Sequence, residues 1–175
     1  VKNLDIGKME HKTPEYKKIA PNSRIPALEL ENGQIILETT AICRYLEYIH
    51  PSPNLFGEDA MEIAQIEMWY SRISFELMLP LMHGFRHTHP HMSALEHQNN
   101  EFGLAQRELA VKSLKYYEEV IAEKEFIACD KFSYADIQMT VSLQFLVRLN
   151  RIDINDYANL SKYIGNISAR PSFSV

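Results

Sequence analysis

The chain has 175 residues, of which 46% are hydrophobic and 23% are charged, and its formal net charge is −5. This composition is ordinary for a globular protein, and the acidic balance excludes the basic surface that a nucleic-acid-binding protein needs. No apolar run approaches the roughly 18 residues that a membrane-spanning helix requires. We therefore predict neither a nucleic acid nor a membrane as a partner.

The two cysteines, Cys43 and Cys129, lie far apart and form no Cys-x-x-Cys motif. This pattern indicates two free thiols and a reducing compartment, so we predict a cytoplasmic location.

The first 50 residues mix strand and helix patterns. Residues 1–6 have the pattern of a short strand. Thr13 followed by Pro14 predicts a capped helix over 14–19, because proline is favoured at the first helical position. Prolines 51 and 53 then end any regular structure and indicate a linker.

Residues 27–37 predict a β-hairpin. Apolar and polar residues alternate over 27–31, and an apolar strand returns over 34–37. The Asn32-Gly33 pair between them predicts a type I′ turn, in which both central residues have positive φ. Glu38-Thr39 then opens a helix over 39–49, with Ile42, Leu46 and Ile49 on one face.

The rest of the chain is predicted to be helical, with three N-terminal capping signals. Asp59 with Glu62, Ser93 with Glu96, and Ser133 with Asp136 each have capping-box spacing. Pro80 is expected to kink or break the first of these helices.

Apolar residues follow each capping signal at helical spacing, and they define the predicted buried faces. They are Ile63, Ile66, Trp69, Tyr70, Ile73 and Leu77 in the first helix, Phe102, Ala105, Leu109, Tyr116 and Val120 in the second, and Ile137, Val141, Phe145 and Leu149 in the third.

Three segments carry a family resemblance. The first reads Ala20-Pro-Asn-Ser-Arg-Ile-Pro-Ala-Leu28, followed by Glu38-Thr-Thr-Ala-Ile42 and Tyr45-Leu46; the others are Phe132-Ser-Tyr-Ala-Asp136 and Arg170-Pro171. Together they resemble the soluble glutathione transferases, and the overall pattern is typical of the bacterial type. Ala20 replaces the usual Asn and Thr39 replaces the usual Ser, although the second change keeps the hydroxyl.

The resemblance implies an α+β fold: an incomplete thioredoxin-like domain over 1–50, a linker over 51–57, and an all-α helical bundle over 58–175. The family's domain begins with a strand and a helix ahead of the strand that 1–6 resembles. We therefore expect the sequence to be incomplete, and the catalytic Tyr, Ser or Cys to lie outside it.

The resemblance also implies which residues hold glutathione. A cis bond before Pro26 is expected to turn the backbone of Ile25 towards the cysteinyl residue. Thr39, at a helix N-terminus, would bind the γ-glutamyl carboxylate, and Glu38 would contact the ammonium group. Arg24, with Ser23 as a weaker candidate, would approach the glycyl carboxylate.

The implied function is transfer or exchange of the glutathione thiol with a small hydrophobic electrophile, in a homodimer that buries Arg44 and the helices at 39–49 and 59–87. A non-catalytic binding or regulatory protein, or a glutathione-dependent isomerase or reductase, stays open on the same scaffold. Glutathione is the only cofactor expected.

Two further sets of residues have two interpretations each. Tyr70, Met78, Met82 and Phe85 either line a hydrophobic-substrate pocket or belong to the core. His83 and His87, spaced i and i+4, either chelate a metal or belong with His89, His91 and His97 to a solvated histidine-rich loop. We predict no metal, because no cysteine or carboxylate joins them in a metal-site motif. Cys43 is expected to be a buried structural thiol.

Overall fold

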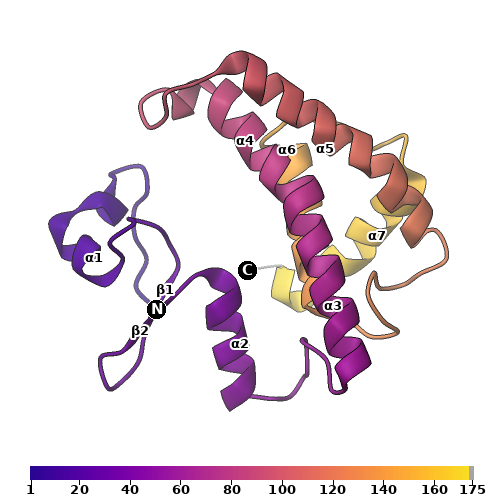
Figure 1. Ribbon diagram of the computed structural model, residues 1–175, viewed down its shortest axis with the longest axis horizontal. Helices are drawn as coiled ribbons and strands as arrows, with labels where there is room; N and C mark the ends of the chain where they lie inside the picture. Colours follow the sequence, from indigo (N-terminus) through magenta and orange to yellow (C-terminus); the bar gives the residue numbers. More distant parts are fainter. Residues whose placement is uncertain (174–175) are drawn as a thin grey trace. The chain divides into compact units, whose positions relative to one another are not determined.

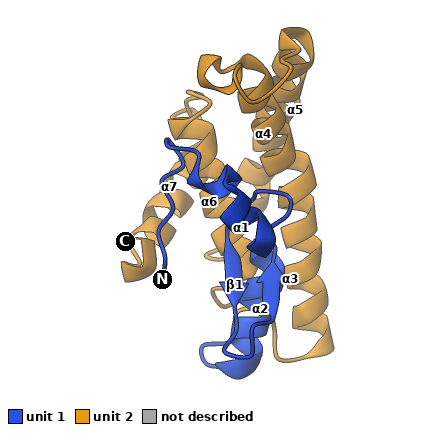
Figure 2. Ribbon diagram, turned by 90° about the vertical axis from the view of Figure 1, so that its left-hand side faces the viewer, with its two compact units in different colours: residues 1–54 blue, residues 55–175 orange. Residues whose placement is uncertain are grey.

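The computed structural model describes residues 1–173, which form two compact units (Figure 2). The first unit, Val1–Asn54, contains the sheet, and the second, from Leu55 onwards, contains helices (Figure 1). The predicted α+β class is therefore confirmed. Each unit is described separately below.

The first unit consists of short elements around a two-stranded sheet. They are the 3₁₀ turn Glu10–Lys12, α1 (Pro14–Ile19), β1 (Ala27–Glu29), β2 (Ile35–Leu37) and α2 (Thr39–Ile49). The Thr13 hydroxyl accepts the N–H of Tyr16 at 3.3 Å, so Thr13 caps α1 as expected. The two predicted helices of this unit are confirmed.

The predicted strand over residues 1–6 is wrong. Residues 1–5 have no regular structure, and β1 and β2 pair only with each other in the described sheet. Without a neighbouring strand, an extended segment has no partners for its backbone N–H and C=O groups, so these residues form no β-strand. Asp5 instead begins a turn in which its N–H donates to the Glu10 carboxylate at 2.7 Å.

The hairpin is present, but the predicted type I′ turn is wrong. Leu28 pairs with Ile36, and the Gly33 N–H donates to the Leu30 carbonyl at 2.9 Å. Gly33 has φ 82°, whereas Asn32 is absent from the described residues with positive φ. The loop is therefore a three-residue connection with a type I turn and a glycine bulge. The Asn32 side chain accepts the Gln34 N–H at 3.0 Å, which favours this turn.

The predicted apolar face of α2 is only partly buried. Ile42 is 8% exposed, whereas Leu46 and Ile49 are 40% and 46% exposed. The helix packs on β1 and β2, which have three residues each and are therefore about 10 Å long. Eleven helical residues extend about 16 Å, so the hairpin leaves the last turns uncovered.

The second unit is built around α6 (Tyr134–Arg148). The other elements are α3 (Ala60–Ile73), a π turn at Ser74–Met78, α4 (Leu79–Thr88), the 3₁₀ turn Pro90–Met92, α5 (Asn100–Ile121), α7 (Ala158–Ser168) and the 3₁₀ turn Pro171–Phe173. Helix α6 packs against α3, the π turn, α4 and α7, and α4 runs along α5 (Figure 1). Every helix described in residues 1–173 is too short or too polar to cross a bilayer.

The capping and interruption predicted for the first long helix are confirmed. The Asp59 carboxylate accepts the N–H groups of Met61 and Glu62 at 2.8 and 2.9 Å. The π turn ends two residues before Pro80, whose ring cannot fit a regular α-helical interior. Of the predicted face, Ile66, Trp69, Ile73 and Leu77 are buried, but Ile63 is 43% exposed.

The helix start predicted at Ser93 is wrong, because both partners of that capping pair bond elsewhere. The Ser93 hydroxyl donates to the Pro90 carbonyl at 2.8 Å, and the Glu96 carboxylate pairs with Arg86 at 2.6 Å. Helix α5 starts instead at Asn100, where the Asn99 side chain accepts the N–H of Phe102 at 3.0 Å.

The buried face predicted for α5 is also wrong. Phe102, Leu109 and Tyr116 are 39%, 52% and 37% exposed, and the buried residues are Gly103, Ala110, Leu114, Tyr117 and Ile121. Two of these are small, which lets α4 approach closely. A Cβ on Gly103 would lie 2.9 Å from the Cβ of His87.

The face predicted for α6 needs a similar correction. Val141 and Leu149 are 39% and 43% exposed. The buried residues include Ala135, Met139, Thr140, Ser142, Leu143 and Leu146. Because α6 has neighbours on several sides, its buried surface is wide and includes small polar residues.

The capping box at the start of α6 is confirmed and is fully buried. Asp136 accepts the Ser133 N–H at 2.8 Å and the Ser133 hydroxyl at 2.7 Å. Its other carboxylate oxygen accepts the Ile127 N–H at 2.8 Å and the Tyr163 hydroxyl at 2.6 Å. One carboxylate therefore joins the loop before α6, the α6 N-terminus and α7.

Candidate glutathione site

The site predicted from sequence lies at the open end of the hairpin. Ala27 pairs with Leu37 as the last pair of the ladder. Pro26 and Glu38 are the next residues outward on the two strands. The hairpin register therefore brings Ile25-Pro26 and Glu38-Thr39 to the same end of the sheet, as the sequence predicted.

The loop before β1 has the expected backbone feature. The Ile25–Pro26 peptide bond is cis. No hydrogen bond within residues 1–173 uses the Ile25 backbone, and its side chain is 52% exposed. An extended peptide could therefore pair with this residue as an added strand.

The Arg24 peptide groups, unlike those of Ile25, are held by two side chains. The Arg24 N–H donates to the Asn22 side-chain oxygen at 3.2 Å, and its carbonyl accepts the Tyr16 hydroxyl at 2.8 Å. Ser23, which has φ 57°, makes the tight turn just before it. The Arg24 side chain is exposed.

Glu38 and Thr39 form the start of α2, and Glu38 rather than Thr39 is its N-cap. The Glu38 carbonyl accepts the Ile42 N–H at 3.0 Å, but its side chain makes no capping bond. Its φ of 69° is unusual for a residue with a Cβ, and such residues cluster at binding sites. The helix N-terminus thus offers N–H groups and a favourable dipole to an anion.

Both parts of the chain match one family. Residues 1–49 match the glutathione S-transferase N-terminal domain, and residues 70–171 match the glutathione S-transferase C-terminal domain. The chain belongs to the glutathione S-transferase family. The thioredoxin-like character predicted for the first domain is thereby confirmed.

The chain is similar to proteins with two different names, a glutathione S-transferase and an elongation factor 1-gamma. It is 35% identical to glutathione S-transferase 2 of Saccharomyces cerevisiae over 81% of the chain and 62% of that protein. It is 26% identical to elongation factor 1-gamma 3 of rice over 98% of the chain but only 40% of that protein. The chain thus spans less than two thirds of these relatives.

A solved structure supports the same assignment. The crystal structure of Gtt2 from Saccharomyces cerevisiae superposes with a TM-score of 0.88 at 31% identity, covering 98% of this chain and 83% of that one.

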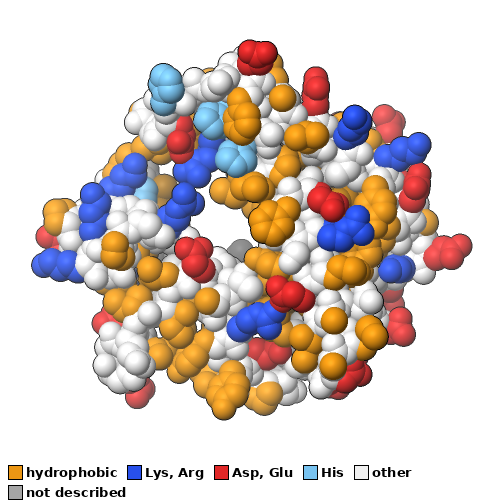
Figure 3. All heavy atoms as spheres, viewed as in Figure 1, with side chains coloured by type: hydrophobic (Ala, Val, Ile, Leu, Met, Phe, Trp, Pro, Cys, Tyr) orange, Lys and Arg blue, Asp and Glu red, His pale blue; other side chains and the backbone are white. Residues whose placement is uncertain are grey.

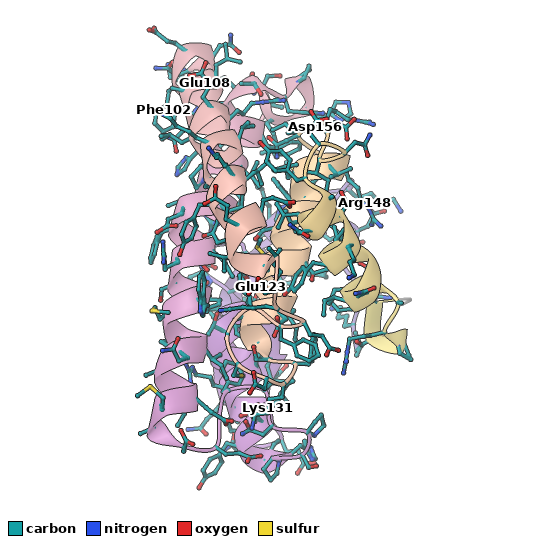
Figure 4. The ribbon with its side chains drawn as sticks, turned by 90° about the vertical axis from the view of Figure 1, so that its right-hand side faces the viewer. Phe102, Glu108, Glu123, Lys131, Arg148 and Asp156 are labelled. Carbon is teal, nitrogen blue, oxygen red and sulfur yellow. The ribbon has the colours of Figure 1, made fainter. Side chains whose placement is uncertain are left out.

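The contacts of the histidines favour packing over metal binding. The rings of His83 and His87 lie 6.2 Å apart, and each forms a T-shaped contact with the Phe102 ring. Figure 4 shows Phe102 near the start of α5, and Figure 3 shows histidine side chains, in pale blue, grouped at the upper left of the molecule. The His87 Nδ1 atom accepts the Asn99 N–H at 3.2 Å, so neutral His87 carries its proton on Nε2 and offers a metal no free lone pair. No group of three or more metal ligands occurs in residues 1–173.

Two proposed substrate-lining residues make core contacts. The Tyr70 ring lies 5.2 Å from that of Tyr134, and the Phe85 ring lies 5.7 Å from that of Phe145. These contacts favour the core interpretation for both residues.

The Tyr163 phenol and the Cys129 thiol are not activated for thiol chemistry. Burial, together with Asp136, raises the pKa of the Tyr163 phenol well above its usual value, and burial raises the pKa of the Cys129 thiol. Cys43, in α2, is half-buried rather than buried, and it belongs to no disulfide in residues 1–173.

Proposed function

We propose that the chain binds glutathione at the open end of its hairpin and transfers the glutathione thiol to a small hydrophobic electrophile. The observation that carries this proposal is the hairpin register, which places the free Ile25 backbone beside the α2 N-terminus. The homology to glutathione S-transferase 2 supports the transfer step.

Each part of the tripeptide has a matching group. The Ile25 backbone would pair with the cysteinyl residue, and Pro26 would hold that backbone in its open arrangement. The Thr39 hydroxyl and helix N–H groups would bind the γ-glutamyl carboxylate, with Glu38 on the ammonium group. Arg24 would contact the glycyl carboxylate. The group that stabilises the thiolate is unassigned.

We propose that the three segments of the chain have different roles. Residues 1–50 would bind glutathione, residues 51–57 would serve as the linker, and residues 58–175 would bind the electrophile. Residues 174 and 175 lie outside the part of the chain that the structure describes. Cys43 and Cys129, which form no disulfide in the described residues, support the proposal of a cytoplasmic location.

Titration of the protein with S-methylglutathione tests the binding step. Saturable one-to-one binding by calorimetry is the expected result, with glycylglycine as the control ligand that lacks the γ-glutamyl group. If the two ligands bind equally weakly, the proposed site is wrong.

Similarity to elongation factor 1-gamma favours a second candidate, a binding or regulatory role without catalysis. The same site would then hold glutathione, but no conjugate would form. Product analysis with electrophiles separates the two functions, and a glutathione-dependent isomerase or reductase would reveal itself by a rearranged or reduced product.

We also propose that the protein is a homodimer whose second-unit interface includes an apolar surface on α3, the π turn, the start of α4 and α5. The exposed residues of this surface are Met68, Phe75, Leu79, Leu109 and Tyr116. Arg72 of α3 contacts Tyr116 of α5 within this surface. Its guanidinium donates to the Tyr116 hydroxyl at 2.7 Å and lies 4.6 Å from that ring. From sequence, Arg44 and α2 are the other candidates for the interface.

Light scattering should therefore give about twice the 20.3 kDa chain mass at micromolar concentration. Phe75, which is 69% exposed, should be critical, so Phe75→Glu is expected to yield monomers. Val147→Glu on α6, where the side chain is 39% exposed, is the control and should stay dimeric. A monomeric wild-type chain would contradict the proposal.

A further inference from the structure

Tyr16 makes a contact that the glutathione motif does not include. Its hydroxyl donates to the Arg24 carbonyl at 2.8 Å, across eight positions of sequence. Thr13 and Pro14 fix the start of α1, and Tyr16 therefore projects from the first turn of a capped helix. The tyrosine is half-buried, so its ring is held in place while its hydroxyl reaches the loop.

This contact controls the direction of a neighbouring group. The Arg24 carbonyl and the Ile25 N–H belong to one planar trans peptide unit, in which they point in opposite directions. A hydrogen bond that holds the carbonyl towards Tyr16 therefore aims the Ile25 N–H away from α1. This N–H is the donor that the proposed strand pairing with glutathione needs.

Asn22 holds the preceding peptide unit in the same way. Its side-chain oxygen accepts the Arg24 N–H at 3.2 Å, so side chains fix the peptide units on both sides of the Arg24 Cα. Within residues 1–173, the Ile25 N–H has no partner of its own. The loop is thus ordered by contacts that leave the binding group open.

We propose that Tyr16 is a positioning residue for the cysteinyl residue of glutathione, acting through the Arg24–Ile25 peptide unit. This inference rests on the proposed function. Tyr16 need not touch the ligand; it holds a donor in the direction that binding requires, which reduces the ordering cost of binding.

Replacement of Tyr16 by phenylalanine removes the hydroxyl and keeps the ring. We expect the dissociation constant for S-methylglutathione to rise about 3- to 10-fold, the range that corresponds to one hydrogen bond. Tyr48→Phe is the matched control, because that side chain is 86% exposed on α2 of the same unit, and it should bind like the wild type.

A second ligand distinguishes positioning from a general structural defect. The γ-glutamyl methylamide carries the amine and carboxylate but lacks the cysteinyl backbone. Its weaker binding should be unchanged in Tyr16→Phe, because it uses only the α2 N-terminus. Equal losses for both ligands would show a structural defect and overturn the positioning role.

Hydrogen exchange at the Ile25 amide gives an independent readout. S-methylglutathione should slow this exchange in the wild type and slow it less in Tyr16→Phe at equal site occupancy. Asn22→Ala, which removes the acceptor of the Arg24 N–H, serves as the second variant. It should also weaken the binding of S-methylglutathione. If the wild type binds and both variants match its affinity, the inference is wrong; if the wild type does not bind, the proposed function fails and the inference with it.

Discussion

Replacement of Asp136 by alanine is expected to lower the free energy of unfolding of the helical unit by about 3–5 kcal/mol. The carboxylate is fully buried and accepts four hydrogen bonds, from two backbone N–H groups and two hydroxyls. Alanine leaves all four donors without this acceptor in a site that excludes water. The hydrogen bonds that are lost join three segments, the loop before α6, the α6 N-terminus and α7, so a shift of one segment cannot restore them all.

Urea unfolding followed by circular dichroism measures this effect. Asp136→Asn should be intermediate, because its amide keeps one acceptor oxygen but directs two N–H groups towards other donors. Asp130→Ala is the control, since this carboxylate is exposed six residues earlier, and its change should stay within about 0.5 kcal/mol. An Asp136→Ala variant as stable as the control would show that the network contributes little.

The helix starts show when a sequence predicts local structure. Asp59 and Ser133 were predictable because each cap and its partner lie within one turn and meet no better alternative. Ser93 and Glu96 have the same spacing, but Arg86 lies ten residues away from Glu96 and forms the stronger charged contact in the fold. A tertiary partner of this kind is invisible to a local pattern.

Helix faces were less predictable than helix positions. The α5 sequence has large apolar residues on two sides, and the prediction chose Leu109 and Tyr116 although the core uses Ala110 and Leu114. The close approach of α4 at Gly103 explains why small residues are inside. A prediction based on hydrophobicity alone therefore underestimates how often small residues such as glycine and alanine are buried between helices.

The candidate site was predictable where its residues form a contiguous motif. Ile25-Pro26 and Glu38-Thr39 belong to one motif, and the hairpin between them brings both pairs to one end of the sheet, while their role in binding stays a prediction. Tyr16 and the positive φ of Glu38 were not predicted, because one depends on a contact across a loop and the other on backbone geometry. The alternating strand pattern and the Asn32-Gly33 pair predicted the hairpin correctly but not its turn type.

The double replacement of Glu38 and Thr39 by alanine is expected to weaken glutathione binding about 100- to 1,000-fold. It removes a carboxylate proposed to pair with the ligand ammonium and a hydroxyl proposed to bind its carboxylate. Hydrogen bonds to charged groups contribute about 1.5–3 kcal/mol each, and two at the lower end, about 3–4 kcal/mol together, account for this loss of affinity. Retention on immobilised glutathione should therefore be lost.

The position of these residues makes the experiment specific to binding. Both side chains are exposed, and Glu38 makes no capping bond, so the variant should keep the wild-type thermal midpoint. Glu31→Ala is the matched control, because Glu31 is an exposed carboxylate at the closed end of the same hairpin. It changes the net charge by the same amount as the double variant but leaves the open end intact. If the double variant binds like Glu31→Ala, the γ-glutamyl group is held elsewhere, and the helix N-terminus is not the site.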